Sequence, residues 1–271
     1  MKYLKILSKQ TDKNGSYAIF KDNKVSLLDK NPITNKAQQT GISFPINEIE
    51  KFLPPVDPPN IIALGLNYKE HAKESNMAIP NEPIIFLKST SSITGHLQPI
   101  ILPEQAPDEV DYEGELCIVI GKTAKNVSEK NAWKYVFGYT CGNDVTARDC
   151  QMKIDKQWAR AKSFDTFCPI GPWIETEINP LDFKIQTRLN GKIMQNDSTK
   201  NMIFNIYQII NYLSKQMTLL PGTIIMTGTP PGIGFGKKPS IFLKENDIIE
   251  VEIENIGILK NKITGNKKNN I

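Results

Sequence analysis

The residues at 111–120, DYEGELCIVI, constrain the fold more than any other stretch of the chain. The run ends in β-branched apolar residues and is followed by Gly121, so it predicts a strand. Because side chains alternate along a strand, Glu113 and Glu115 share one face of it. Two carboxylates on one face of an otherwise apolar strand repel each other. The stretch therefore predicts either an edge strand with a solvated face or a site for a hard divalent cation such as Mg²⁺.

A second strand-like run at 137–145, FGYTCGNDV, favours the cation site over the solvated edge strand. It ends on Asp144, which supplies a third oxygen ligand at the end of a strand. We therefore expect Glu113, Glu115 and Asp144 to converge on one divalent ion. A helical turn is expected directly after this run, over 146–151.

Arg148 lies four residues after Asp144. The turn expected over 146–151 could bring Arg148 and Gln151 close to the Asp144 carboxylate. An isolated lysine is normally a surface residue, but Lys162 follows between Trp158 and Phe164, so we expect it to be half buried. A buried lysine beside a metal site can stabilise a developing anion.

The segment at 65–74, GLNYKEHAKE, follows a buried strand and predicts a short helix. Asn67 could cap this helix, with Glu70 completing a capping box. His71 and Glu74 are three residues apart and share one helix face, where a carboxylate can orient an imidazole that acts as a general base. The alternative is a surface helix with a casual His–Glu pair. The loop that follows looks flexible, so the helix could belong to a mobile lid.

A glycine-rich turn at 227–234, TGTPPGIG, follows another short strand. It matches neither a P-loop nor a dinucleotide-binding motif. The turn can present backbone N–H groups and the Thr229 hydroxyl to a carboxylate, or it is only a tight turn.

Proline marks the boundary that we expect between two folding units. The segment LPPVDPP at 53–59 holds four prolines, which fix φ and remove hydrogen-bond donors. The predicted organisation is a small β-rich domain at 1–53, a linker at 54–59, a catalytic domain at 60–264 and a frayed tail at 265–271.

Local patterns predict three other elements and the environment of one side chain. A hairpin is expected at 16–28, and a second one at 183–193 around Asn190-Gly191. The spacing of apolar residues over 204–217 predicts an amphipathic helix. His96 is expected to face solvent in a loop.

Composition argues against two classes of protein. No stretch approaches the about 18 apolar residues of a membrane span, and the N-terminus lacks a signal-peptide core, so we expect a cytoplasmic protein without a membrane partner.

The net charge of +4 raises the question of nucleic-acid binding. However, only three of the 33 basic residues are arginines, and the lysines are scattered among 29 acidic residues. Because phosphate and base recognition favours arginine, no nucleic-acid partner is expected. The four cysteines lack C-x-x-C spacing and are expected to be reduced.

Five of these segments, in this order along the chain, resemble the fumarylacetoacetate hydrolase family. They are 65–74, 111–115, 143–151, 162–169 and 227–234. The resemblance covers roughly residues 60–263. It implies an α+β fold, a mixed β-roll with a small β-rich N-terminal domain, and a homodimer.

The same resemblance implies roles for single residues. In this family, the residues that match Glu113, Glu115 and Asp144 bind Mg²⁺ or Mn²⁺, those that match Lys162, Gln151 and Thr229 face the substrate, and those that match His71 and Glu74 form a dyad on a lid. Position 66 departs from the pattern, because it is leucine where the acylpyruvate-hydrolysing branch carries arginine. A substrate carboxylate thus lacks one expected partner, which argues against acylpyruvate hydrolysis.

These features together predict a Mg²⁺-dependent enzyme for a small 2-oxo acid that carries a second carbonyl or carboxylate. The cation would chelate the C1 carboxylate and the C2 oxygen and hold enolate charge as it develops, while His71 moves a proton or activates water. The same site supports C–C bond hydrolysis, keto–enol tautomerisation, double-bond isomerisation and decarboxylation. The non-enzymatic alternative is a metal-binding structural protein on the same fold.

Overall fold

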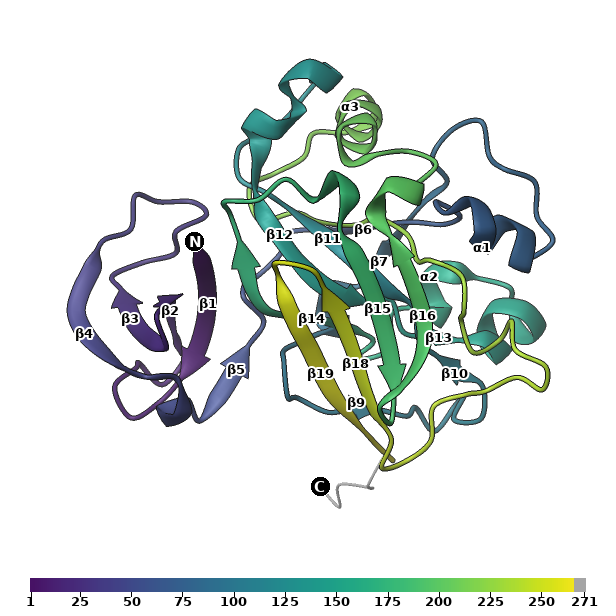
Figure 1. Ribbon diagram of the computed structural model, residues 1–271, viewed down its shortest axis with the longest axis horizontal. Helices are drawn as coiled ribbons and strands as arrows, with labels where there is room; N and C mark the ends of the chain where they lie inside the picture. The colour runs from purple at the N-terminus through teal and green to yellow at the C-terminus, as the bar shows by residue number, and fades with distance from the viewer. Residues whose placement is uncertain (266–271) are drawn as a thin grey trace.

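Five strands near the N-terminus enclose a small apolar core at one side of the molecule (Figure 1). The computed structural model describes residues 1–265, so the expected frayed tail at 265–271 lies outside the described residues apart from Gly265. The strands are β1 (Lys2–Leu7), β2 (Ser16–Lys21), β3 (Lys24–Leu28), β4 (Gln39–Pro45) and β5 (Lys51–Leu53). The predicted hairpin at 16–28 is confirmed, with Asp22 and Asn23 at φ values of 49° and 60° in its turn.

These strands extend the main sheet of the protein, because β1 pairs antiparallel with β14. The sheet has the order β4-β3-β2-β1-β14-β12-β11-β17-β6-β7, and it is mixed, since β17 and β6 are parallel while their neighbours are antiparallel. Its remaining strands are β6 (Ile61–Leu64), β7 (Ile85–Lys88), β11 (Gly114–Ile120), β12 (Val136–Asn143), β14 (Cys168–Glu175) and β17 (Ile224–Met226), with the short β8 (Ile93–Thr94) beside β14.

A second sheet packs against the first and closes the roll. Its order is β16-β15-β18-β19-β9, and the two-residue strands β10 and β13 pair with each other nearby. Leu116 and Ile118 of the main sheet share one core with Val251 and Ile253 of the second. The strands are β9 (Ile100–Ile101), β10 (Val110–Asp111), β13 (Thr146–Ala147), β15 (Lys184–Leu189), β16 (Lys192–Ser198), β18 (Ile248–Ile253) and β19 (Gly257–Thr264).

Helices are few and short, which gives the predicted α+β, sheet-rich fold. The α-helices are α1 (Lys69–Glu74), α2 (Trp158–Ala161) and α3 (Ile206–Gln216). Helix α3 confirms the predicted amphipathic helix and buries Ile206, Ile209, Ile210 and Leu213. No helix among the described residues is long and apolar enough to cross a bilayer. The four cysteines are free and buried.

The predicted capping box at the start of α1 is wrong. Tyr68 is the N-cap, and it makes no side-chain capping bond. The Asn67 amide instead donates to the carbonyl oxygens of Phe204 and Thr227 at 3.0 and 2.7 Å, and its Oδ1 accepts from the Phe204 N–H at 2.8 Å. Asn67 therefore joins its own segment to those of Phe204 and Thr227 rather than capping the start of α1.

Two other local expectations need correction. The helical turn expected over 146–151 begins two residues late, because Thr146 and Ala147 form the strand β13, whereas Arg148 and Asp149 are helical and lead into a π-helix at Cys150–Ile154. His96 is half-buried rather than solvent-facing, because its Nδ1 accepts a hydrogen bond from the Lys260 N–H at 3.1 Å.

Candidate active site

Three buried carboxylates converge where β11 and β12 pair. Glu113 directly precedes β11, Glu115 lies on it, and Asp144 directly follows β12. The Asp144 N–H donates to the Glu113 carbonyl oxygen at 2.8 Å, which fixes this register. One carboxylate oxygen from each of the three residues lies within 4.8 Å of the others. The structure thus brings together the three residues that the sequence proposed as metal ligands.

Lys162 lies directly against this cluster. Its Nζ donates to Glu113 Oε2 at 2.9 Å, to Asp144 Oδ2 at 2.6 Å and to the Thr146 hydroxyl at 2.8 Å. Burial alone would lower the pKa of Lys162, but the charges of Asp144 and Glu113 raise it above its usual value. Lys162 is therefore a buried ammonium, and it bridges two of the oxygens that a cation would use.

Arg148 does not contact Asp144. Its Nε donates to Asp111 Oδ2 at 2.9 Å, and its two terminal nitrogens donate to Gln151 Oε1 at 2.7 Å and to Glu113 Oε1 at 2.6 Å. The guanidinium therefore fixes one side of the carboxylate cluster and orients Gln151. Asp111, which the sequence analysis did not single out, is the buried partner that holds Arg148.

Lys88 is a second site residue that sequence reasoning missed. It ends strand β7, and its Nζ donates to Asp144 Oδ1 and, at 3.0 Å, to the carbonyl oxygen of Phe167. Both side chains of the Lys88–Asp144 pair are fully buried. A lysine at the end of an apolar strand is mostly a surface residue, so the pattern gave no sign of this contact.

The carboxylates differ in their electrostatic environment. Burial alone would raise the pKa of Glu113, but Lys162 and Arg148 lower it to about 2. Burial raises the pKa of Glu115 well above its usual value, and the charges of Asp144 and Glu113 add to the effect. Within the described residues, Glu115 Oε1 has no hydrogen-bond partner. Of the three carboxylates, Glu115 is thus the one whose negative charge is least balanced by hydrogen bonds and positive partners.

His71 and Glu74 form a pair beside the cluster, with Nδ1 and Oε2 3.4 Å apart. His71 is only 7% exposed, which does not fit a casual pair on a surface helix. The Glu74 carboxylate also accepts from the Gly232 N–H at 2.9 and 3.1 Å. Burial alone would raise the pKa of Glu74, but the bonds from His71 and Gly232 lower it. The imidazole lies close enough to Glu113 to help lower its pKa.

The glycine-rich segment after β17 does present N–H groups to carboxylates, and these belong to the chain itself. Gly228 N–H donates to Glu115 Oε2 at 2.8 Å, and Gly234 N–H donates to Asp111 Oδ1 at 2.8 Å. Thr229 donates its hydroxyl to the Gly114 carbonyl oxygen at 3.0 Å and accepts from Gln195 at 2.7 Å. Together with the Gly232 N–H, which binds Glu74, the segment therefore fixes the positions of three acidic side chains, and it also contacts the cavity.

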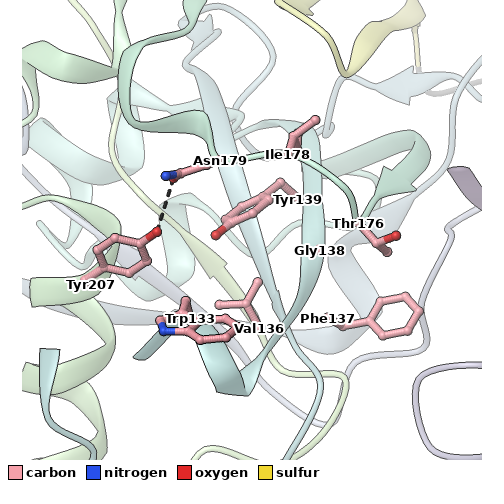
Figure 2. A pocket seen from close by; sticks show the side chains of 9 residues that line it. All are labelled: Trp133, Val136, Phe137, Gly138, Tyr139, Thr176, Ile178, Asn179 and Tyr207. Carbon is pink, nitrogen blue, oxygen red and sulfur yellow. Dashed lines mark hydrogen bonds between the residues drawn. The ribbon is translucent and has the colours of Figure 1, made fainter. Parts of the chain in front are cut away.

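A cavity of about 600 Å³ opens onto part of this cluster, since Glu113 and Lys162 line it whereas Glu115 and Asp144 do not. It is lined by His71, Glu74, Glu113, Arg148, Gln151, Lys162 and Thr229. A second hollow, of about 300 Å³, lies around Trp133, Tyr139 and Tyr207, where the Tyr207 hydroxyl bonds Asn179 (Figure 2). It is lined by aromatic, apolar and neutral polar residues and by none of the predicted site residues, so the larger cavity is the candidate active site.

The residues of the cluster fit a hard divalent cation. All three side chains offer oxygen, which Mg²⁺ and Mn²⁺ prefer. The unpartnered Glu115 Oε1 is a buried polar atom whose burial is unfavourable without a positive partner. The cluster could therefore hold a metal ion.

Comparison with known proteins agrees with this geometry. Residues 60–264 match the model of the fumarylacetoacetate (FAA) hydrolase C-terminal family. The chain belongs to the fumarylacetoacetate hydrolase family. This confirms the resemblance seen in the sequence.

Relatives and solved structures extend the likeness over most of the chain. The fumarylacetoacetate hydrolase domain-containing protein 2 homolog of Dictyostelium discoideum is 52% identical over 79% of this chain and 74% of its own. The mitochondrial oxaloacetate tautomerase Fahd2a of Rattus norvegicus is 43% identical over 81% of this chain and 71% of its own. The crystal structure of 5-carboxymethyl-2-hydroxymuconate delta-isomerase from Mycobacterium smegmatis is 37% identical, with a TM-score of 0.86 over 98% of this chain and 100% of that one.

Proposed function

We propose that this protein is a metal-dependent enzyme that acts on a small 2-oxo acid, by keto–enol tautomerisation or by C–C bond hydrolysis. The observation that carries the proposal is the buried convergence of Glu113, Glu115 and Asp144 beside Lys162. A cavity that is also lined by the His71–Glu74 pair reaches this cluster at Glu113 and Lys162. The names of two relatives, an oxaloacetate tautomerase and a delta-isomerase, support proton transfer next to a carbonyl group as the chemistry.

A bound Mg²⁺ or Mn²⁺ ion would supply Lewis acidity to the 2-oxo group of the substrate. Glu113, Glu115 and Asp144 would hold the ion. Lys162 carries a fixed positive charge next to the same oxygens, so it favours an anionic substrate and the negative charge that develops when a proton leaves C3. Arg148 holds Gln151 at the cavity wall, where its amide can bind a substrate oxygen.

His71 is the group that can move the proton. Glu74 engages its Nδ1, so Nε2 is the ring nitrogen left to accept a proton from C3 or to return it. In tautomerisation the proton moves between C3 and the 2-oxo oxygen, and no bond between carbon atoms breaks. In hydrolysis the same imidazole would activate water for attack on a 4-oxo group.

A leucine, a phenylalanine and a tryptophan form an apolar part of the cavity wall. Leu66, Phe86 and Trp158 line it on the side of α1 and α2. Such a wall excludes water from the reacting carbon, which favours tautomerisation over hydrolysis. Leu66 also places no positive charge there, so a substrate carboxylate has to meet one of the other cations that line the cavity, which are Arg148, Lys162, Lys237 and Lys238.

A panel of 2-oxo acids tests the proposal. Oxaloacetate, an acylpyruvate, fumarylacetoacetate and an oxaloheptenedioate are each offered to chelator-treated protein with and without added Mg²⁺, and products are followed by NMR. We expect Mg²⁺-dependent turnover, with oxaloacetate enolisation or ketonisation the fastest. NMR also distinguishes decarboxylation and double-bond isomerisation, the alternative reactions at this site.

Glu115→Gln, which removes one acidic oxygen while keeping the side-chain shape, is the matched control for the panel. It should be inactive where the wild type is active. Mg²⁺ binding without turnover of any compound would favour the non-enzymatic alternative, a metal-binding structural protein.

A further inference from the structure

The three carboxylates of the cluster share an arrangement in which one oxygen is held by a protein donor and the other is turned toward the cluster. Glu113 Oε1 accepts from Arg148 at 2.6 Å, and Glu115 Oε2 accepts from the Gly228 N–H at 2.8 Å. Asp144 Oδ1 accepts from Lys88. Of the three remaining oxygens, Glu113 Oε2 and Asp144 Oδ2 bond Lys162, and Glu115 Oε1 has no partner among residues 1–265.

Lys88 is held firmly in place. Its side chain and that of Asp144 are both fully buried. A second bond, from Nζ to the Phe167 carbonyl oxygen at 3.0 Å, holds the ammonium between two acceptors. The Phe167 carbonyl in turn accepts from the Val145 N–H at 3.1 Å, next to Asp144 along the chain. The ammonium is therefore fixed relative to both the carboxylate and its backbone.

Asp144 Oδ1 is held by Lys88 behind the carboxylate, so it does not reach a cation in the cluster, whereas the oxygens that Lys162 bonds face the cluster. With Oδ1 on Lys88, Asp144 can offer only Oδ2 and so binds through one oxygen. Ca²⁺ prefers six to eight oxygen ligands, often with carboxylates that bind through both oxygens. Mg²⁺ prefers a near-octahedral set with few carboxylate oxygens and retains open positions.

We propose that Lys88 is a positioning residue that restricts Asp144 to one oxygen and thereby makes the cluster select Mg²⁺ over Ca²⁺. This role for Lys88 rests on the proposed function, because it concerns the same cation. It is distinct from that of Lys162, which touches the oxygens that face the cluster rather than those behind it.

Loss of the Lys88 charge and loss of its positioning of Asp144 should affect the Mg²⁺ and Ca²⁺ affinities differently. Lys88, Lys162 and Arg148 face four carboxylates, those of Asp111, Glu113, Glu115 and Asp144. Removing the positive charge of Lys88 would strengthen the binding of every divalent cation to the cluster. Only the release of Asp144 Oδ1 would favour Ca²⁺ over Mg²⁺, so the ratio of the two affinities measures positioning.

The test is isothermal titration calorimetry of Mg²⁺ and of Ca²⁺ on chelator-treated full-length protein. Lys88→Met removes the donor and keeps an apolar side chain of similar length. Lys88→Arg keeps a cationic donor. The control is Lys5→Met, because Lys5 also forms an ion pair with an aspartate, at 2.5 Å from Asp57, but in the N-terminal strands. Circular dichroism shows which variants are folded.

We expect the wild type to bind Mg²⁺ more tightly than Ca²⁺. Lys88→Met should shift the affinity ratio toward Ca²⁺ by roughly tenfold or more, the lower end of the effect of losing an outer partner of a metal ligand. Lys88→Arg and Lys5→Met should keep the wild-type ratio within about threefold.

Three results would overturn the role of Lys88 in different ways. A folded Lys88→Met with the wild-type ratio removes the positioning role while leaving the cation site intact. If that variant does not fold, the wild type decides. Wild-type protein that binds Ca²⁺ as tightly as Mg²⁺ would also rule out the positioning role, because there would be no selectivity to explain. Wild-type protein that binds neither ion contradicts the proposed function itself.

Discussion

Glu115 is the single residue on which the proposed cation site depends most. Its Oε1 has no hydrogen-bond partner in the part of the chain that the structure describes, and the like charges of Asp144 and Glu113 lie close by. Glutamine keeps the shape and removes the charge. We expect Glu115→Gln to unfold at the same temperature as the wild type or higher, and to lose Mg²⁺ affinity by at least about tenfold. Calorimetry with unchanged Mg²⁺ affinity would exclude this residue as a ligand.

His71 should contribute to turnover rather than to substrate binding. Its ring is oriented by Glu74, which Gly232 holds independently of the imidazole. In His71→Ala we therefore expect turnover of the best substrate to fall by roughly 10²–10⁴-fold, the usual contribution of a general base. Binding of oxalate, a 2-oxo acid mimic, should remain nearly intact. A variant that works at the wild-type rate would make the pair a structural contact only.

Lys162→Met should differ from His71→Ala, because it should affect ligand binding as well as turnover. The ammonium of Lys162 lies on Glu113 and Asp144 and lines the cavity, so its charge meets an anionic ligand directly. Turnover and oxalate binding should both fall in this variant. The two substitutions together separate proton transfer from charge stabilisation.

Sequence patterns predicted the acidic residues of the site better than their basic partners. Strand alternation paired Glu113 with Glu115, and a strand end supplied Asp144. Lys88 lies at the end of an ordinary apolar strand, so only the pairing of distant segments shows that it reaches Asp144. The same holds for Arg148, whose partner Asp111 could not be identified before the fold was known.

At the scale of elements, two similar capping patterns had different outcomes. Asn205 and Gln208 form a real capping box at the start of α3. Asn67 and Glu70 have the same spacing at the start of α1, but the Asn67 side chain binds backbone groups of Phe204 and Thr227. Local sequence offers the cap in both cases, and tertiary hydrogen bonds decide whether the side chain makes it.

Helix α1 and the segment after β17 form one wall of the cavity, joined by the bonds from the Gly232 N–H to Glu74. Lys237 follows in this segment, lines the cavity and is close enough to Glu74 to lower its pKa. No carboxylate of residues 1–265 forms an ion pair with it. If the proposed function holds, we expect its ammonium to meet a second carboxylate of a 2-oxo diacid.

Lys237→Met should therefore raise the KM for oxaloacetate by roughly two- to fivefold, as expected for a half-exposed ion pair worth about 0.4–1 kcal/mol. The KM for a 2-oxo acid with one carboxylate should not change. Lys122→Met, at an exposed lysine outside the cavity, is the control. Equal changes for both substrates would show that Lys237 does not recognise the second carboxylate.

At the scale of the whole molecule, strand positions were predictable but strand order was not. The two hairpins and helix α3 follow from local patterns. The pairing of β1 with β14 joins Lys2 to Glu175, and the neighbouring positions of β17 and β6 join Ile224 to Ile61. Such contacts depend on the packing of two apolar sheet faces, which no short segment encodes.

Association of two chains remains a prediction from the family resemblance. We expect a homodimer with twofold symmetry, which is the commonest assembly of soluble proteins. Light scattering coupled to size-exclusion chromatography should give about twice the mass of one 30.5 kDa chain at micromolar concentration. A mass equal to a single chain would contradict it.

His96 links the N-terminal strands to the rest of the molecule. Its ring packs edge-on against Phe52 of β5, with centroids 5.0 Å apart, and its Nδ1 accepts from the Lys260 N–H of β19. Burial, together with the charge of Lys260, lowers the pKa of His96 to about 4. Protonation would place a hydrogen on the very atom that accepts this bond, so the folded protein requires the neutral ring.

The pH dependence of stability follows from that pKa. In the unfolded chain His96 has a pKa of about 6.5, so between about pH 6.5 and pH 4 the unfolded state binds more protons than the folded state. The contribution of His96 to stability is therefore complete above about pH 6.5 and is lost as the pH falls toward 4. His96→Gln keeps an acceptor and does not titrate. Between about pH 7 and pH 5 we expect the wild type to lose on the order of 1–2 kcal/mol more of its free energy of unfolding than this variant, measured by urea denaturation. Parallel losses in the two proteins would show that the contact between β5 and β19 does not depend on a neutral histidine.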